Sequence, residues 1–227
     1  TMSAASSPSG YAQSKTGTIT FTGSGTYLIR PSVAVTTNVT ATTCSNVSDA
    51  AFTCNGTAVP INGTLSAGTW YKVTSSPTLT FTSNGTVTYK ITDGTNYKDG
   101  GAGTISSIDR TAPISTTITT SKSSNSITVT ATGTDNESGI SGYQFSNDGG
   151  KTWVPGTPQS GKSYTFSGLT SGTYSIKARS INGTYENSNQ NTLNTTESTA
   201  TSVTTDDLVI VTPRVSPSGY AQSKTAQ

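Results

Sequence analysis

The chain of 227 residues has no histidine, one methionine and two cysteines, and only 11% of its residues are charged. Without histidine, no Ser–His or Cys–His catalytic pair can form within the chain. A carboxylate pair would need two acidic groups facing each other across a cleft, but the acidic residues here fall in predicted turns. We therefore expect no enzyme activity and no organic cofactor.

Concentrated positive charge and long apolar runs are missing as well. The net charge is +2, and the 13 Lys and Arg residues are scattered without a basic run. This distribution argues against a nucleic-acid partner. No stretch approaches the ~18 consecutive apolar residues that a membrane-spanning helix needs, so we expect no membrane insertion.

Threonine, serine, asparagine and glycine make up most of the remaining residues. Threonine is β-branched and suits the half-exposed surface of a strand. The apolar residues alternate with polar ones, which is the two-residue period of strands, and pairs such as Asn84-Gly85 and Asp148-Gly149 supply hairpin turns. The sequence predicts an all-β protein built from short strands.

A ten-residue segment, SPSGYAQSKT, occurs twice, at residues 7–16 and again at residues 216–225. The offset is 216 − 7 = 209 residues. The simplest interpretation is tandem repetition of a unit of this length. The alternative is a tag or linker duplicated at both ends.

Residues 109–113, with the sequence DRTAP, divide one period into two regions of alternating pattern. Proline removes a ladder donor and restricts the preceding residue, which suits a short, stiff junction. We predict a first domain at residues 17–109 and a second at 110–212. Residues 1–16 open this repeat, and residues 213–227 open the next. The last strand of the second domain is expected at residues 208–211, after a long surface loop over residues 186–205.

The second region resembles the immunoglobulin-like and fibronectin-type tandem repeats of large surface adhesins of Gram-positive-type bacteria. The matching segments are DRTAP at 109–113, DNESGI at 135–140, YQFSNDGGKTW at 143–153 and FSGLTSGTYSIKAR at 166–179. The resemblance implies two tandem immunoglobulin-like β-sandwich domains in an extracellular setting, at a cell surface or attached to a cell wall. It implies no particular ligand, and the first region shares only its closing stretch.

Aromatic residues of the second region are expected in its core. Tyr143, Phe145 and Trp153 fit a strand–turn–strand pair whose aromatic faces point inward. The facing sheet is expected to supply Phe166, Tyr174, Ile176 and Ala178. A ligand platform at Trp153 is the alternative.

Cys44 and Cys54 are expected to form a disulfide, because a metal site would need further ligands. Closing a loop of this size contributes about 2–3 kcal/mol in the chain-entropy picture. A disulfide indicates an oxidising compartment. The alternative is two reduced, buried thiols.

Asp135 and Glu137 share one predicted loop and are the best candidates for binding an ion. With Asp109 at the junction and backbone carbonyls they could surround Ca²⁺, which prefers oxygen ligands. Such an ion would stiffen the junction, whereas the alternative is a solvated turn. An isopeptide bond from Lys15 or Lys122, as found in some related surface modules, is a further possibility, but the sequence shows no convincing acid partner.

Three functions are compatible with these patterns. The first is a stalk or spacer in adhesion, a rod whose partners are neighbouring repeats of the same protein. The second is a binding module for a host glycan or matrix protein, with Trp70, Tyr71 and Tyr97 as exposed aromatic contacts rather than core residues. The third is a subunit that polymerises through donated strands, with residues 7–16 as the connector.

Overall fold

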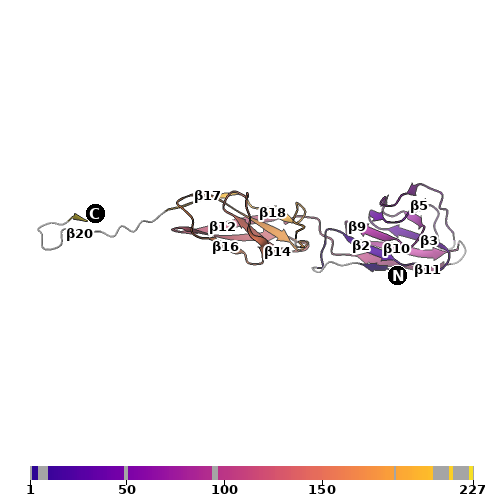
Figure 1. Ribbon diagram of the computed structural model, residues 1–227. Coiled ribbons are helices and arrows are strands. Elements are labelled where there is room, and N and C mark those ends of the chain that lie inside the picture. The colour runs from indigo at the N-terminus through magenta and orange to yellow at the C-terminus, as the bar shows by residue number, and fades with distance from the viewer. Residues whose placement is uncertain are drawn as a thin grey trace.

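The computed structural model of this chain describes residues 2–4, 10–48, 51–93, 97–186, 188–206, 215–216 and 225–226. These residues form strands, turns and bends but no helix, and none of them could therefore span a membrane as a helix. Figure 1 shows two sandwiches arranged end to end. The all-β fold class is confirmed.

The first sandwich consists of two antiparallel sheets. One has the order β1-β2-β9-β4-β7 and the other β11-β10-β3-β8-β5-β6. The strands are β1 Met2–Ala4, β2 Lys15–Ile19, β3 Thr26–Pro31, β4 Val35–Thr37, β5 Ala41–Cys44, β6 Ala58–Val59, β7 Thr64–Leu65, β8 Trp70–Val73, β9 Thr78–Phe81, β10 Gly85–Thr92 and β11 Tyr97–Ile105.

The core of the first sandwich follows from the strand period, because alternate side chains point to the same face. Leu79 and Phe81 on β9 meet Tyr71 and Val73 on β8 between the two sheets, and all four are buried. Their neighbours Trp70 and Lys72 point to the outer face. Burying this apolar layer supplies the main favourable free energy of folding.

The second sandwich has the strand arrangement of an immunoglobulin-like module, with a three-stranded sheet β12-β13-β16 facing the sheet β15-β14-β17-β18, and β19 also paired to β17. The strands are β12 Ser115–Ser123, β13 Ser126–Thr134, β14 Ile140–Ser146, β15 Val154–Gln159, β16 Ser163–Phe166, β17 Gly172–Asn182, β18 Thr195–Glu197 and β19 Thr201–Thr205. The chain therefore holds two tandem β-sandwiches, with separate cores on either side of residues 109–113.

The core of the second sandwich differs in part from the prediction. Tyr143 and Phe145 are buried in it as expected, but Ile176 and Ala178 lie on β17, in the same sheet as those two aromatics. The facing sheet supplies Ile127, Val129, Ala131 and the predicted Phe166. The alternating pattern shows which side chains of β17 point to the core. It does not show whether β17 lies in the same sheet as β14 or in the facing sheet.

The predicted loop at residues 186–205 is wrong in its second half, which contains β18 and β19. These strands are rich in threonine and serine, and Val203 is the one aliphatic side chain of β19 that packs on the core. A strand with so little apolar contrast has no visible two-residue period. The predicted strand at residues 208–211 lies outside the described residues.

Candidate functional site

The repeated segment lies against the chain that links the two sandwiches. Ala12 donates its backbone N–H to the Ser107 carbonyl at 3.2 Å and accepts one from Asp109 at 3.0 Å. Lys15 Nζ donates to the carbonyls of Gly10 at 2.7 Å and Ser106 at 2.8 Å. Residues 10–15 therefore hold the linker by main-chain bonds and by one lysine.

Residues 10–15 brace the junction between the two sandwiches, and Gln13 extends their contacts to the second sandwich. Its amide nitrogen donates to Asn191 Oδ1 at 3.1 Å, and Asn191 Nδ2 donates back to Gln13 Oε1 at 3.1 Å. Arg110 Nη1 donates to the Gln13 carbonyl at 3.2 Å. The repeated segment thus contacts both sandwiches and the linker. Sequence reasoning missed Gln13, although its place in the repeated segment was the available signal.

Asp109 is the buried centre of the junction, with 1% of its surface exposed. Its Oδ1 accepts the backbone N–H of Thr111 at 2.9 Å. Its Oδ2 accepts from the backbone N–H and hydroxyl of Ser138 and from Asn182 Nδ2 at 3.1 Å. Burial alone would raise the pKa of Asp109, but the hydrogen bonds from Ser138 and Thr111 outweigh it and hold the pKa below its ordinary value.

The predicted partners of Asp109 lie in the same cluster. Asp135 Oδ1 accepts the backbone N–H groups of Glu137 at 3.0 Å, Ser138 at 2.9 Å and Gly139 at 3.0 Å. Its Oδ2 accepts from Asn182 Nδ2 at 3.3 Å. Glu137 accepts the hydroxyl of Thr111. The structure therefore places Asp109, Asp135 and Glu137 in one hydrogen-bonded cluster with Thr111, Ser138 and Asn182.

The junction cluster formed by Asp109, Asp135, Glu137 and their partners is held together by hydrogen bonds between protein groups. The oxygens of Asp109 and Asp135 already accept protein donors. Among the described residues, no group of three or more acidic, cysteine or histidine side chains is arranged to hold a metal ion. The calcium site at Asp109, Asp135 and Glu137 stays a prediction.

Gly183 lets the loop after β17 close on this cluster. Its N–H donates to Ser138 Oγ and to the Gly139 carbonyl, each at 3.0 Å. A Cβ at this position would lie 2.5 Å from the backbone oxygen of Ser138. The loop can therefore approach Ser138 only with glycine at position 183.

Replacing Gly183 by alanine is expected to lower the free energy of unfolding of the second sandwich by about 1–3 kcal/mol, because backbone must move to relieve the clash. The measurement is chemical denaturation. Gly156→Ala is the matched control, since a Cβ at Gly156 meets nothing within 4 Å. Equal losses in the two variants would contradict the close approach at Gly183.

The disulfide between Cys44 and Cys54 is present, as predicted. It ties β5 to a loop on the outer face of the first sandwich. Lys90, with 3% exposure, donates from Nζ to the Ser48 carbonyl in that loop and lies 5.0 Å from the centroid of the Trp70 ring. The disulfide loop therefore covers part of this outer face.

The tryptophans lie on outer faces rather than in cores. The Arg179 guanidinium lies 4.3 Å from the centroid of the Trp153 ring, so the predicted inward orientation of Trp153 is wrong. The stacking offers Trp153 a polar partner that the apolar core could not. Tyr71 is buried at 3% exposure in the first core. The Tyr97 side chain lies outside the described residues.

A shallow hollow lies on the first sandwich, and Arg30 in its wall also contacts the half-buried Trp70. Its volume is about 450 Å³, and it is lined by Arg30, Pro31, Ser32, Gly68, Thr86 and Thr88. Arg30 lies 5.0 Å from the centroid of the Trp70 ring. An aromatic ring, a guanidinium and hydroxyls are groups that can contact a sugar.

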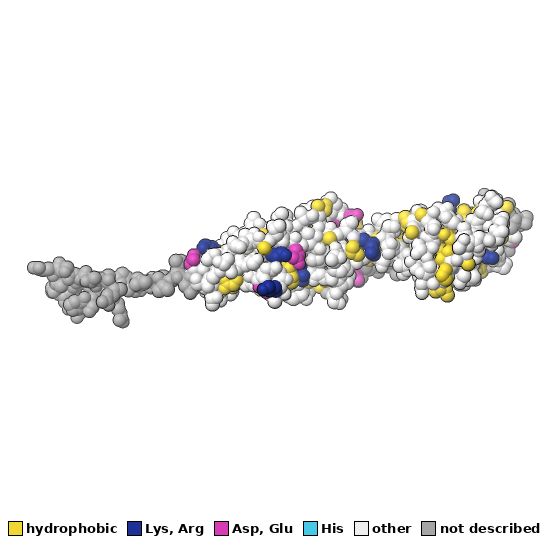
Figure 2. Space-filling model, turned by 90° about the horizontal axis from the view of Figure 1, so that it is seen from above, with side chains coloured by type: hydrophobic (Ala, Val, Ile, Leu, Met, Phe, Trp, Pro, Cys, Tyr) yellow, Lys and Arg dark blue, Asp and Glu magenta, His cyan; other side chains and the backbone are white. Residues whose placement is uncertain are grey.

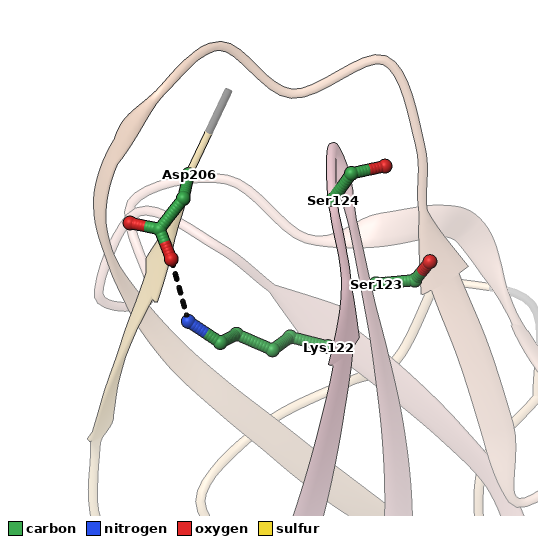
Figure 3. Close-up of a pocket in the computed structure, with 4 residues that line it drawn as sticks. All are labelled: Lys122, Ser123, Ser124 and Asp206. Carbon is green, nitrogen blue, oxygen red and sulfur yellow. Dashed lines mark hydrogen bonds and ion pairs between the residues drawn. The ribbon is translucent and has the colours of Figure 1, made fainter. Parts of the chain in front are cut away.

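Lys122 lies at the end of the second sandwich remote from the junction, in the hollow shown in Figure 3. Its Nζ is 3.1 Å from Asp206 Oδ2, and these side chains are 51% and 65% exposed. Ser123 and Ser124 lie at the adjacent hairpin, with their hydroxyls turned away from the ion pair. The pair is open to water.

We expect no isopeptide bond between Lys122 and Asp206, because a water-exposed ion pair lacks the buried setting that would favour condensation. Intact mass spectrometry of the folded chain checks this. The mass should equal that of the sequence with one disulfide. A further loss of one water molecule, abolished by Lys122→Ala, would establish the bond.

Comparisons with known proteins add little to this description. No protein-family model matches the chain, and no curated protein is significantly similar to it in sequence. Among solved structures, the FN1–FN3 domains of chicken CNTN1 align with a TM-score of 0.35 and 11% sequence identity. The alignment covers 86% of this chain and 64% of that chain, which is less than two thirds of its length. The fold assignment therefore rests on the strand order and the two cores.

Proposed function

We propose that this chain is a structural repeat unit of a long extracellular or cell-surface protein, acting as a stalk or spacer in adhesion. One observation carries the proposal. The segment that recurs after 209 residues is the one whose first copy braces the junction between the two sandwiches. A repeat unit that carries its own brace gives every copy the same fixed geometry, which a spacer needs.

The surface supports this role. Figure 2 shows a face that is mostly neutral and polar, with few charged side chains and small hydrophobic patches. Such a surface offers little to non-specific partners. The disulfide fits an oxidising, extracellular compartment. In a stack of such units each contacts mainly its neighbours, so the length of the rod grows with the number of copies.

The brace is tested by removing the amide pair between Gln13 and Asn191. Gln13→Ala with Asn191→Ala is expected to leave both sandwiches folded but to allow bending at the junction, because this pair of side chains joins the sandwiches and lies outside both cores. Small-angle X-ray scattering should show a broader distance distribution at unchanged thermal stability. Asn55→Ala, at an exposed site away from the junction, is the control. An unchanged distribution would show that Gln13 does not set the geometry.

A binding module is the second candidate, supported by the hollow that Arg30 lines and by the contact of Arg30 with Trp70. A glycan and matrix-protein array separates the two functions. The spacer proposal expects no reproducible binding by the chain. Binding that is lost in both Trp70→Ala and Arg30→Ala, with the fold intact, would make this face a ligand site and overturn the spacer as the sole function.

The proposed calcium role of the junction cluster has its own test. Thermal unfolding is followed with Ca²⁺ and with a chelator, for the chain and for Glu137→Gln. A rise in Tm with Ca²⁺ that Glu137→Gln removes would confirm a calcium site at Asp109, Asp135 and Glu137. Equal Tm values with Ca²⁺ and with the chelator would show that hydrogen bonds alone hold the junction cluster together.

A further inference from the structure

The outer face of the six-stranded sheet in the first sandwich gathers cations that are far apart in the sequence. Arg30 lies on β3 and Lys72 on β8, which are neighbouring antiparallel strands. Leu28 is opposite Lys72, so Arg30, two residues further along β3, is diagonal to Lys72 on the same face. Diagonal neighbours lie about 7–8 Å apart, within reach of long side chains. The sheet register therefore brings two positive charges onto one small area.

Neither cation has a carboxylate partner within the part of the chain that the structure describes. No described residue forms an ion pair or a hydrogen bond with the side chain of Arg30 or Lys72. Lys177, by contrast, is paired with Glu197. Arg30 contacts the Trp70 ring, at 5.0 Å from its centroid. A cation–π contact uses none of the guanidinium N–H groups as hydrogen-bond donors, so these donors are available to a ligand.

The hollow that Arg30 lines adds hydroxyl groups to this charge. Thr88 lies opposite Arg30 on β10. Ser32 and Thr86 line the hollow as well, and the Thr86 N–H donates to Ser32 Oγ at 2.8 Å, which fixes the two residues relative to each other. None of the described lining residues is acidic. A guanidinium can bind a carboxylate or a sulfate through two parallel hydrogen bonds, and the neighbouring hydroxyls can bond to the hydroxyls of a sugar.

An open site of this kind favours a polymer over a single small anion. Water screens an exposed cation, so one anionic group gains little by binding to it. The repeated segment recurs after 209 residues, and a tandem protein would present the same site once in every copy. A polymer with regularly spaced anionic groups could then engage several copies together, and the weak single contacts would combine.

We propose that Arg30, Lys72 and the hydroxyl-lined hollow bind an acidic polysaccharide. Arg30 takes a carboxylate or sulfate group of one sugar, the hydroxyls of Ser32 and Thr88 contact the sugar hydroxyls, and Lys72 attracts the next anionic group along the polymer. The inference rests on the binding module put forward above as the second candidate function, and it names the ligand class of that module.

The test measures binding to two pairs of polymers that differ in charge. Polygalacturonate is compared with its methyl ester, and dextran sulfate with dextran, in the presence of a calcium chelator. Biolayer interferometry with the chain immobilised at high density presents many copies, as a tandem protein would. In at least one pair, the acidic polymer is expected to bind about tenfold more tightly than its neutral partner and to weaken as salt is added. The pair that shows the difference identifies the anionic group as carboxylate or sulfate.

Substitutions assign the binding to this face. Arg30→Gln is expected to weaken the binding of the acidic polymer about tenfold, because it removes the charged donors. Lys72→Gln should weaken it by a smaller factor, and this variant carries the test if circular dichroism shows that Arg30→Gln does not fold. Lys162→Gln is the matched control, since it removes one exposed positive charge from the second sandwich and should leave the affinity unchanged.

The proposal and the binding module fail by different results. Equal binding of the acidic and neutral polymers, no binding of any of the four, or equal losses in Arg30→Gln and Lys162→Gln would overturn the acidic ligand. A neutral glycan bound at Arg30 and Trp70 would keep the binding module and overturn only its ligand class. The binding module itself fails if the glycan and matrix-protein array shows no binding.

Discussion

Replacing Asp109 by alanine is expected to lower the free energy of unfolding of the second sandwich by about 2–4 kcal/mol, because several buried donors lose a charged acceptor. Asn182, with 0% exposure, and the N–H groups of Ser138 and Thr111 would be left without this partner. The measurement is urea denaturation followed by circular dichroism, with the first sandwich as an internal reference.

Asp109→Asn is the matched variant, since it keeps the shape of the side chain and one carbonyl oxygen. It should cost less than Asp109→Ala but still loosen the junction, because its NH₂ group faces donors in place of an acceptor. Asp206→Asn is the control for loss of an exposed carboxylate and should have little effect. Equal effects of Asp109→Asn and Asp206→Asn would show that the Asp109 charge does not hold the junction.

The Asp109 carboxylate should also make the free energy of unfolding of the second sandwich depend on pH. Its pKa in the folded chain lies below that of the unfolded chain. A depressed carboxyl pKa contributes stability above the unfolded value, near pH 4, and this contribution is lost as the pH falls through the folded value. The difference in stability between the chain and Asp109→Asn should therefore be largest at neutral pH and shrink below about pH 4.

The strands that alternate clearly in sequence could be predicted, and the reason is physical. In β10 and β13, apolar side chains such as Val87, Tyr89, Ile127 and Val129 recur every second residue and enter the cores. In β19 the period is hidden by hydroxyl side chains. Trp153 precedes β15 and stacks on Arg179 of β17, which is distant in sequence, so a local pattern could not reveal its orientation.

The junction site was predictable only in part. Asp109, Asp135 and Glu137 stand in two sequence motifs that the sequence singles out as one candidate site, and in the structure they share hydrogen-bond donors such as Thr111, Ser138 and Asn182. Other parts of the junction come from distant segments: Asn182, which donates to Asp109 and Asp135, ends β17, and Gln13, which bonds to Asn191, belongs to the repeated segment near the start of the chain. Tertiary packing brings these residues together, and the spacing of residues within a single motif does not encode that packing. The network therefore had to be seen in three dimensions.

Removing the disulfide is expected to destabilise the first sandwich and not the second. Cys44 and Cys54 are separated by 10 positions. A closed loop of this size contributes about 2–3 kcal/mol, mainly by restricting the unfolded chain. Cys44→Ala with Cys54→Ala should lower the free energy of unfolding of the first sandwich by that amount and leave the second sandwich unchanged. Guanidinium denaturation with two separable transitions would measure both.

Opening the disulfide should also change the surroundings of Trp70, because the loop that it closes contributes the Ser48 carbonyl to Lys90, and Lys90 lies against the Trp70 ring. In a Trp153→Phe background, fluorescence reports Trp70 alone, and reduction is expected to shift its emission to longer wavelength as water gains access. The double alanine variant should show the same emission with and without reductant. Unchanged emission on reduction, at unchanged stability, would show that the loop holds its place over Trp70 without the disulfide.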